Sequence, residues 1–208
     1  MYTSNYNRNE NSEEIRAFVK ANSFGILVNT LEDKPWATHI PMLLETNDAG
    51  EDILVGHIAR ANPQWHNFVK NSNVLAIFTA HHTYISSSWY NHENVPTWNY
   101  IAVHCYGKIR IIEGEELYQS LKNLMDKYEA YSEKPMRLEK MSEKLVQAQI
   151  RGIVGFEILV EEMQANYKLS QNRKDEDYRN VIQELEKRGD ENSLKIAEEM
   201  SKRRDLSS

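Results

Sequence analysis

The sequence lacks most features that mark secreted, disulfide-bonded or membrane-spanning proteins. Its 208 residues include a single cysteine, Cys105, which excludes an internal disulfide and suits a reducing compartment. The longest apolar runs, "FGILV" and "NVLAIF", are far too short to cross a bilayer. The first ten residues contain no charged region followed by an apolar stretch, so no secretory signal is expected. The sequence therefore predicts a cytoplasmic protein without a membrane partner.

An excess of basic charge is also missing, and so are the common nucleotide and metal motifs. The formal net charge is −6, whereas a protein that grips DNA through phosphates usually has a basic face or domain. The densest basic cluster, "KRRD" at 202–205, is typical of a helix C-terminus, where cations are favoured. GxGxxG, GxxxxGK[ST], CxxC and HExxH do not occur, so neither a Rossmann domain nor a zinc site is predicted.

What the sequence does contain is a series of strand patterns with most of the helices late in the chain. A short helix is expected within 11–22, because Asn11 or Ser12 can cap it and its apolar residues share one face. Two strands joined by the turn-prone "LEDK" predict a hairpin, and four further strands follow. The order predicts an α+β fold with an antiparallel β-barrel core. The strands are expected at 24–30, 35–45, 52–59, 73–80, 98–112 and 153–171, and further helices at 113–132, 137–150 and from 175 onward.

The stretch "GHIARANPQW", residues 56–65, begins as a buried strand and ends as a helix start. Asn62 is a favoured N-cap and Pro63 is tolerated in the first helical turn. A helix N-terminus suits a phosphate, and Arg60 could add a planar, bidentate contact. The alternative is structural: Asn62 caps the helix and Arg60 is a solvated residue at the strand end.

Two more stretches are candidates for a ligand site. "YISSSWYNHENVPTWNY" combines aromatic rings with small hydroxyl groups, as a planar heterocycle requires, but an aromatic mini-core beneath a long loop has the same composition. "YKLSQNR", residues 167–173, places several polar side chains after a strand. It is either a polar clamp for a ligand or the exit from that strand.

Taken together, these stretches resemble one family. "VGHIARANPQW", "YISSSWY", "VPTWNYIAVHCYGKIRII", "IVGFEI" and "KLSQNR" occur in the order and spacing found in PaiB-like proteins, and "NSFGILV…PWATHIPMLL" matches as well. These proteins are bacterial FMN-binding negative transcriptional regulators, related in fold to the pyridoxamine-phosphate-oxidase-like split barrels. The resemblance covers roughly residues 1 to 190, nearly the whole chain.

The resemblance implies a homodimeric split β-barrel with flanking helices, a helical C-terminal tail, and FMN bound between subunits. The expected domains are 1–174, with inserted helices at 114–150, and a charged helical segment at 175–208. Arg60 and Asn62 would contact the FMN phosphate. The other implied contacts are His57 and Ala59 lining the pocket, Thr38 and His39 alongside the flavin ring, Trp89, Pro96, Thr97 and Trp98 covering the isoalloxazine, and Lys168, Ser170, Gln171 and Asn172 closing the site.

Three functions remain open from the sequence. The family resemblance favours negative regulation of transcription, in the type member of sporulation and protease genes, through flavin or effector binding. Direct DNA binding has no support from the charge, and no helix-turn-helix with a basic recognition helix is found. The second candidate is an FMN-dependent oxidoreductase acting on a small molecule; Tyr84, His39 and His104 are its candidate proton donors. The third is haem binding, which would require an axial histidine among the seven present.

Overall fold

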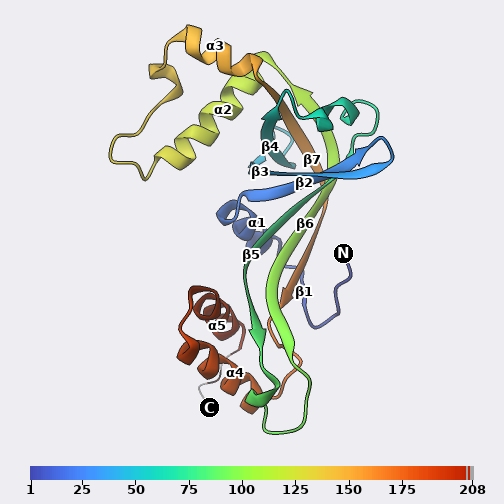
Figure 1. The fold of residues 1–208 in the computed structure, drawn as a ribbon, viewed down its shortest axis with the longest axis vertical. Helices are drawn as coiled ribbons and strands as arrows, with labels where there is room; N and C mark the ends of the chain where they lie inside the picture. Colours follow the sequence, from blue (N-terminus) through green and yellow to red (C-terminus); the bar gives the residue numbers. More distant parts are fainter. Residues whose placement is uncertain (205, 207–208) are drawn as a thin grey trace. The chain divides into compact units, whose positions relative to one another are not determined.

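The computed structural model describes residues 1–204 and 206, and their contacts divide into two compact units. The central unit comprises residues 16–78 and 105–163, and the terminal unit comprises residues 1–15, 79–104 and 164–204 with 206. Three long strands contribute residues to both units. The elements in chain order are β1 (Arg8–Asn9), α1 (Ser12–Ala21), β2 (Phe24–Leu31), β3 (Lys34–Thr46), β4 (Asp52–Ala59), β5 (Asn73–Ile85), β6 (Thr97–Ile112), α2 (Gly114–Glu129), α3 (Glu143–Arg151), β7 (Ile153–Lys168), α4 (Asp175–Arg188) and α5 (Glu191–Arg203) (Figure 1).

The strands form the antiparallel split barrel that was predicted. Their order is β1-β7-β4-β3-β2-β5-β6, and an additional pairing of β7 with β6 closes the ring. β2 and β3 pair in register from Phe24 with Pro41 to Leu31 with Lys34. The turn between them consists of Glu32 and Asp33, both left-handed (φ 49° and 60°), which matches the twist of a tight hairpin.

The core of the central unit lies inside the barrel. Alternate residues of β2 point inward, so that Leu27 is fully buried. Phe68, which follows the β4 junction, packs edge-on against Phe156 of β7 with ring centroids 5.9 Å apart. A second cluster joins the helices to the barrel, because Leu117 of α2 packs with Ile53 of β4 and with Ile150 of α3. The barrel thus has a filled interior.

The terminal unit is held by a strand pairing and a helix pair. β1 pairs with β7, Arg8 opposite Asn166. α4 and α5 lie side by side (Figure 1), separated by Gly189, whose φ of 72° ends α4 in the left-handed conformation. Tyr178 is buried between them and donates a hydrogen bond from its hydroxyl to the carbonyl of Met200, at 2.8 Å. Although α4 and α5 carry many acidic residues, each helix also has buried apolar residues along one side.

Several predicted boundaries are wrong. β5 continues to Ile85, so "HHTYI" is strand and not loop; Thr83 and Ile85 are buried there while Tyr84 is exposed, the alternation of a strand. The helix expected at 137–150 begins at Glu143, after a short 3₁₀ turn. The tail from residue 175 is helical, as predicted, and contains two helices, whereas β1 was not predicted. The domain boundary expected at residue 174 stays a prediction.

Candidate functional site

The junction after β4 is built around the cap that the sequence predicts. Asn62 has extended backbone angles, and its side-chain oxygen accepts a hydrogen bond from the backbone N–H of Gln64 at 3.1 Å. The helix it begins is a five-residue 3₁₀ helix, Pro63–Asn67, and Val69 beyond it is 82% exposed. A helix this short has little macrodipole, so the predicted attraction of a phosphate to its N-terminus is not supported. Any anion contact here depends on side chains.

Arg60 lies at the end of β4 with an exposed side chain. Its Nε donates to the carbonyl of Arg151 at 2.9 Å, and its Nη2 donates to the carbonyl of Ile153 at 2.8 Å. The guanidinium lies 5.9 Å from the ring centroid of Trp65. Nη1 has no hydrogen-bond partner among the described residues. The guanidinium is therefore fixed in place and keeps a donor available.

A buried glutamine, which no local sequence pattern indicates, joins this junction to the barrel. Gln64 is completely buried, and its Nε2 donates to the carbonyl of Leu27 at 3.1 Å. Its Oε1 accepts a hydrogen bond from the Thr38 hydroxyl at 2.5 Å, and that hydroxyl accepts one from Asn62 at 2.8 Å. Thr38 and Asn62, predicted as neighbours of the flavin, are thus in direct contact.

The remaining predicted residues of the central unit lie on the outside of the barrel. His57 and Ala59 share the outer face of β4, because Ile58 between them is buried. His39 is exposed and stacks with Phe24 at a centroid distance of 6.5 Å. His57 is only partly exposed, and burial lowers its pKa below the ordinary value. Its imidazole is accordingly biased toward the neutral form.

We expect the lowered histidine pKa values to make the protein less stable under mildly acidic conditions. Burial lowers the pKa of His57 and also that of His104, the latter with help from the N-terminal ammonium. Between pH 7.5 and 5.5 the unfolded chain therefore binds more protons than the native one, so the free energy of unfolding falls as the pH falls. Urea unfolding across this range should show a shallower pH slope for His57→Gln. An identical slope in variant and wild type would contradict the assignment.

The terminal unit contains a polar pocket of about 100 Å³, room for several water-sized groups. The N-terminal segment, the start of β6 and the turn after β7 contribute to it. Four of the predicted flavin contacts, Thr97, Lys168, Ser170 and Asn172, come together here. The full lining is Ser4, Tyr6, Asn7, Thr97, Asn99, Lys168, Ser170, Asn172 and Arg173.

Positive charge dominates this pocket. Lys168 donates from Nζ to the Thr97 hydroxyl at 2.7 Å, and Arg173 lies 4.6 Å from the ring centroid of Tyr90. Burial, and then the charge of Arg173, lower the pKa of Lys168. Ser170 has a left-handed backbone (φ 62°), and its hydroxyl donates to the side-chain oxygen of Asn99 at 3.1 Å. Asn99 is completely buried, so this wall of the pocket is fixed.

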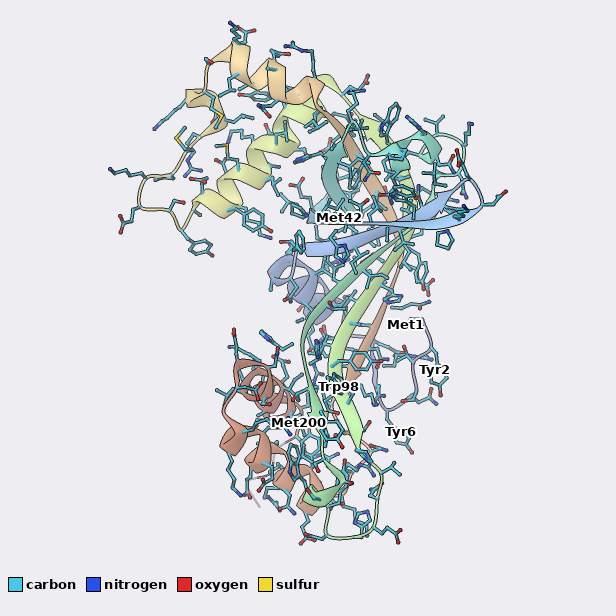
Figure 2. The ribbon with its side chains drawn as sticks, in the orientation of Figure 1. Met1, Tyr2, Tyr6, Met42, Trp98 and Met200 are labelled. Atoms are coloured by element: carbon cyan, nitrogen blue, oxygen red, sulfur yellow. The ribbon has the colours of Figure 1, made fainter. Side chains whose placement is uncertain are left out.

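Four predicted contacts of the terminal unit, Trp89, Pro96, Trp98 and Gln171, lie outside the lining of this pocket. Trp98 is 45% exposed on β6 (Figure 2) and donates from its indole to Nδ1 of His82 at 3.2 Å. Trp89 lies beneath the guanidinium of Arg188, 4.6 Å from ring centroid to Cζ. Gln171 accepts a hydrogen bond from the backbone N–H of Leu169 and so supports the turn instead of lining the cavity.

Neither a metal centre nor a reactive thiol is evident. Among the residues that the structure describes, no three His, Cys, Asp or Glu side chains gather to hold a metal ion. Burial, reinforced by the Asp52 carboxylate, raises the pKa of the Cys105 thiol to about 12, so this sulfur stays protonated. No helix in the described part of the chain is long and apolar enough to span a membrane.

Residues 1–162 match the family described as "Putative FMN-binding domain". The chain belongs to this PaiB-like FMN-binding family. A curated relative, "Protease synthase and sporulation protein PAI 2" of Bacillus subtilis (strain 168), is 47% identical over 200 residues, which are 96% of each chain. The family match includes the β4 junction with Arg60 and Asn62 and ends before the "KLSQNR" turn.

Solved structures share the fold of this chain at much lower sequence identity. The "FAD and Heme binding protein from Mycobacterium smegmatis" is 14% identical with a TM-score of 0.62, over 82% of this chain and 78% of that one. The "Flavocytochrome Anf3 from Azotobacter vinelandii" is 15% identical with a TM-score of 0.61, over 80% and 72%. These similarities establish the split-barrel fold and carry no conclusion about the ligand.

Proposed function

We propose that this protein binds FMN as a homodimer and acts as a negative regulator of transcription of the PaiB type, for genes such as those of proteases and sporulation. The observation that carries the proposal is the family match across the β4 junction, where Arg60 presents a free donor beside Asn62. The curated relative whose name refers to protease synthesis and sporulation supports the regulatory part.

The residues at the β4 junction fit a flavin phosphate through side chains. Arg60 is exposed, its guanidinium is oriented by two carbonyls, and Nη1 remains free to donate to a phosphate oxygen. The amide of Asn62, two residues after Arg60 in the chain, donates a hydrogen bond to the hydroxyl of Thr38 at 2.8 Å, so these two groups form a compact polar pair. FMN, when bound, supplies electron-transfer chemistry, while the protein supplies binding and orientation.

The ring contacts are assigned to exposed or partly exposed side chains on strands. His39, His57 and Ala59 line the outer surface of the central unit, and Trp98 is an exposed aromatic residue of the terminal unit. Aromatic side chains of this kind suit the face of an isoalloxazine. The other proposed contacts of the terminal unit, in the same or the partner subunit, are Trp89, Thr97, Lys168, Ser170, Gln171 and Asn172.

A homodimer is supported by an apolar surface on the outside of the barrel, which we call the outer face. Ile26 of β2 lies between His39 and Ile77 of the neighbouring strands, and Val28 lies between Ala37 and Leu75. Phe24, beside Pro41, is 64% exposed. Ile26, Val28, Leu75 and Ile77 are partly exposed, and contiguous apolar residues that solvent can reach often mark a protein interface. A second copy of the chain is the proposed occupant.

The charge of the protein favours regulation through a ligand over a large phosphate footprint on DNA. The net charge is −6, and the basic cluster at 202–204 is largely neutralised. Lys202 pairs with Glu198 and Glu199, both at 2.9 Å. We therefore place the regulatory signal in flavin or effector binding.

A visible absorption spectrum of the purified protein, repeated after addition of FMN and dialysis, tests the proposal. We expect a retained flavin spectrum. A Soret band would replace flavin by haem, and the absence of any chromophore after FMN addition would reject cofactor binding. Steady turnover of NADH or NADPH by the FMN-loaded protein would favour the oxidoreductase alternative over regulation.

We expect Arg60→Ala to weaken FMN binding by about tenfold or more, since a hydrogen bond to a charged group contributes roughly 1.5–3 kcal/mol. Riboflavin, which has no phosphate, should bind both proteins equally. Fluorescence titration with the two ligands measures this difference. Lys70→Ala, which removes another exposed cation of the central unit, is the matched control. An FMN affinity that Arg60→Ala leaves unchanged would remove the phosphate contact from the proposal.

A further inference from the structure

The side chains at the β4 junction form a chain of hydrogen bonds whose direction is fixed by the barrel. Gln64 of the 3₁₀ helix is completely buried, and its Nε2 donates to the backbone carbonyl of Leu27 at 3.1 Å. A carbonyl oxygen can only accept a hydrogen bond, so the amide of Gln64 cannot be turned the other way. Its Oε1 therefore faces the hydroxyl of Thr38, at 2.5 Å.

The orientation of Gln64 determines what the hydroxyl of Thr38 can do. A hydroxyl group has one hydrogen, and Oε1 of Gln64, which can only accept, takes it. The hydroxyl oxygen is then left as an acceptor, and Nδ2 of Asn62 donates to it at 2.8 Å. Thr38 consequently has no hydrogen that it could donate to a ligand.

The side chain of Asn62 is held at both of its polar atoms. Oδ1 accepts a hydrogen bond from the backbone N–H of Gln64 at 3.1 Å, and Nδ2 donates to Thr38. An amide nitrogen has two hydrogens, and the second one has no acceptor in the part of the chain that the structure describes. Asn62 is partly exposed, so this N–H is the group that it offers to a ligand. A donor suits an anion, whereas the reverse orientation would offer a carbonyl oxygen.

We propose that Gln64 is a positioning residue for the flavin phosphate and that it acts through Thr38. By fixing the direction of the hydrogen bonds, it keeps Asn62 as a donor and so favours FMN over riboflavin, which has no phosphate. A donor that is already oriented loses less entropy on binding. This role rests on the proposed phosphate contacts of Arg60 and Asn62. These two residues share one tight turn, in which the backbone N–H of Asn62 donates to the carbonyl of Ala59 at 2.9 Å.

Fluorescence titration of the full-length protein with FMN and with riboflavin is the test. The ratio of the riboflavin dissociation constant to the FMN dissociation constant measures the phosphate preference. We expect Gln64→Met and Thr38→Val each to lower this preference about fivefold, because a hydrogen bond that orients Asn62 is lost. Thr38→Ser retains the hydroxyl and should keep most of the preference. The double variant should lose no more than either single variant, because both residues act in one chain of hydrogen bonds.

Asn29→Leu is the matched control for the loss of a buried amide at this junction. Asn29 is buried, and its Nδ2 donates to the backbone carbonyl of Gln64 at 3.3 Å, outside the chain of side-chain hydrogen bonds. This variant should keep the wild-type phosphate preference whatever its effect on stability. Thermal unfolding establishes that each variant is folded, and if Gln64→Met is not, the two variants of Thr38 decide the outcome.

The failure of this role and the failure of flavin binding give different results. A wild-type phosphate preference in Gln64→Met and Thr38→Val would overturn the role of Gln64 and leave FMN binding standing. Losses that add in the double variant would show that Gln64 does not act through Thr38. A wild-type protein that binds FMN and riboflavin equally would overturn the phosphate contacts together with this role. A wild-type protein that binds neither flavin would reject the proposed cofactor itself.

Discussion

Gly107→Ala should destabilise the barrel more than an alanine substitution at any other glycine that lacks a positive φ. A Cβ atom built at Gly107 of β6 would lie 2.1 Å from the carbonyl oxygen of Leu159 and 2.9 Å from a methyl group of Ile158, both on β7. The obstacle is backbone and cannot rotate away, so β6 and β7 must separate. These two strands close the ring. Overpacking of this kind usually costs about 1–3 kcal/mol, and we expect about 3 kcal/mol here.

Urea unfolding at neutral pH measures this loss as a lower transition midpoint. Gly152→Ala is the matched control, because Gly152 has an ordinary φ of −83° and its nearest neighbouring atom would be 3.3 Å from the added Cβ. The control should change the free energy of unfolding by no more than about 1 kcal/mol. Equal midpoints for the two variants would mean that the closure of β6 on β7 is not as tight as the structure indicates.

Much of this barrel could be predicted because its signals are local. The hairpin turn at Glu32 and Asp33, the Asn11 cap of α1 and the period-two alternation of β6 all depend on residues close together in the chain. The closure at Gly107 could not be predicted in the same way. The sequence places Gly107 on the inward face of a strand, but which backbone approaches it depends on a pairing with residues about fifty positions away.

The residues of the candidate site differ in the same way: local patterns predict some of them, and others depend on distant parts of the chain. The Asn62 cap follows from the Asn-Pro pair, so the sequence predicted it, and the structure has it. The buried Gln64 was missed because nothing in the local pattern separates it from an exposed glutamine, and its partner Leu27 lies on another strand. Only part of the lining of the polar pocket was predicted. "KLSQNR" indicated Lys168 and its neighbours, but the contribution of the N-terminal Tyr6 depends on the path of the chain.

The family resemblance supplied what patterns could not, and the structure limits how far it applies. It gave the split-barrel class, which the strand order confirms. It also implied that Arg60 and Asn62 contact the flavin phosphate, whereas the local pattern suggested a phosphate at a helix N-terminus, where the structure has a five-residue 3₁₀ helix. Arg60 must therefore contribute by its side chain, and the charge it carries is already oriented by the carbonyls of Arg151 and Ile153. The side chain of Arg60, and not the N-terminus of the 3₁₀ helix, is therefore the proposed phosphate contact to test.

Phe24→Asp should convert the proposed homodimer into monomers. Phe24 lies on the outer face and is 64% exposed, so its loss removes little from the core of one chain. In a two-fold dimer the same surface of each subunit meets, and the two new carboxylates would lie in one interface. Like charges brought together there cost several kcal/mol, which corresponds to a dissociation constant raised by about 100-fold or more. Sedimentation velocity over a range of concentrations measures the shift.

Val69→Asp separates an interface effect from a general effect of surface charge. Val69 is 82% exposed in the same unit but lies outside the outer face, so this variant should remain dimeric. FMN affinity should fall with the dimer in Phe24→Asp, because the proposed site draws contacts from both subunits. A Phe24→Asp protein that stays dimeric would place the interface elsewhere. A monomeric variant that binds FMN as tightly as the wild type would confine the flavin contacts to one chain.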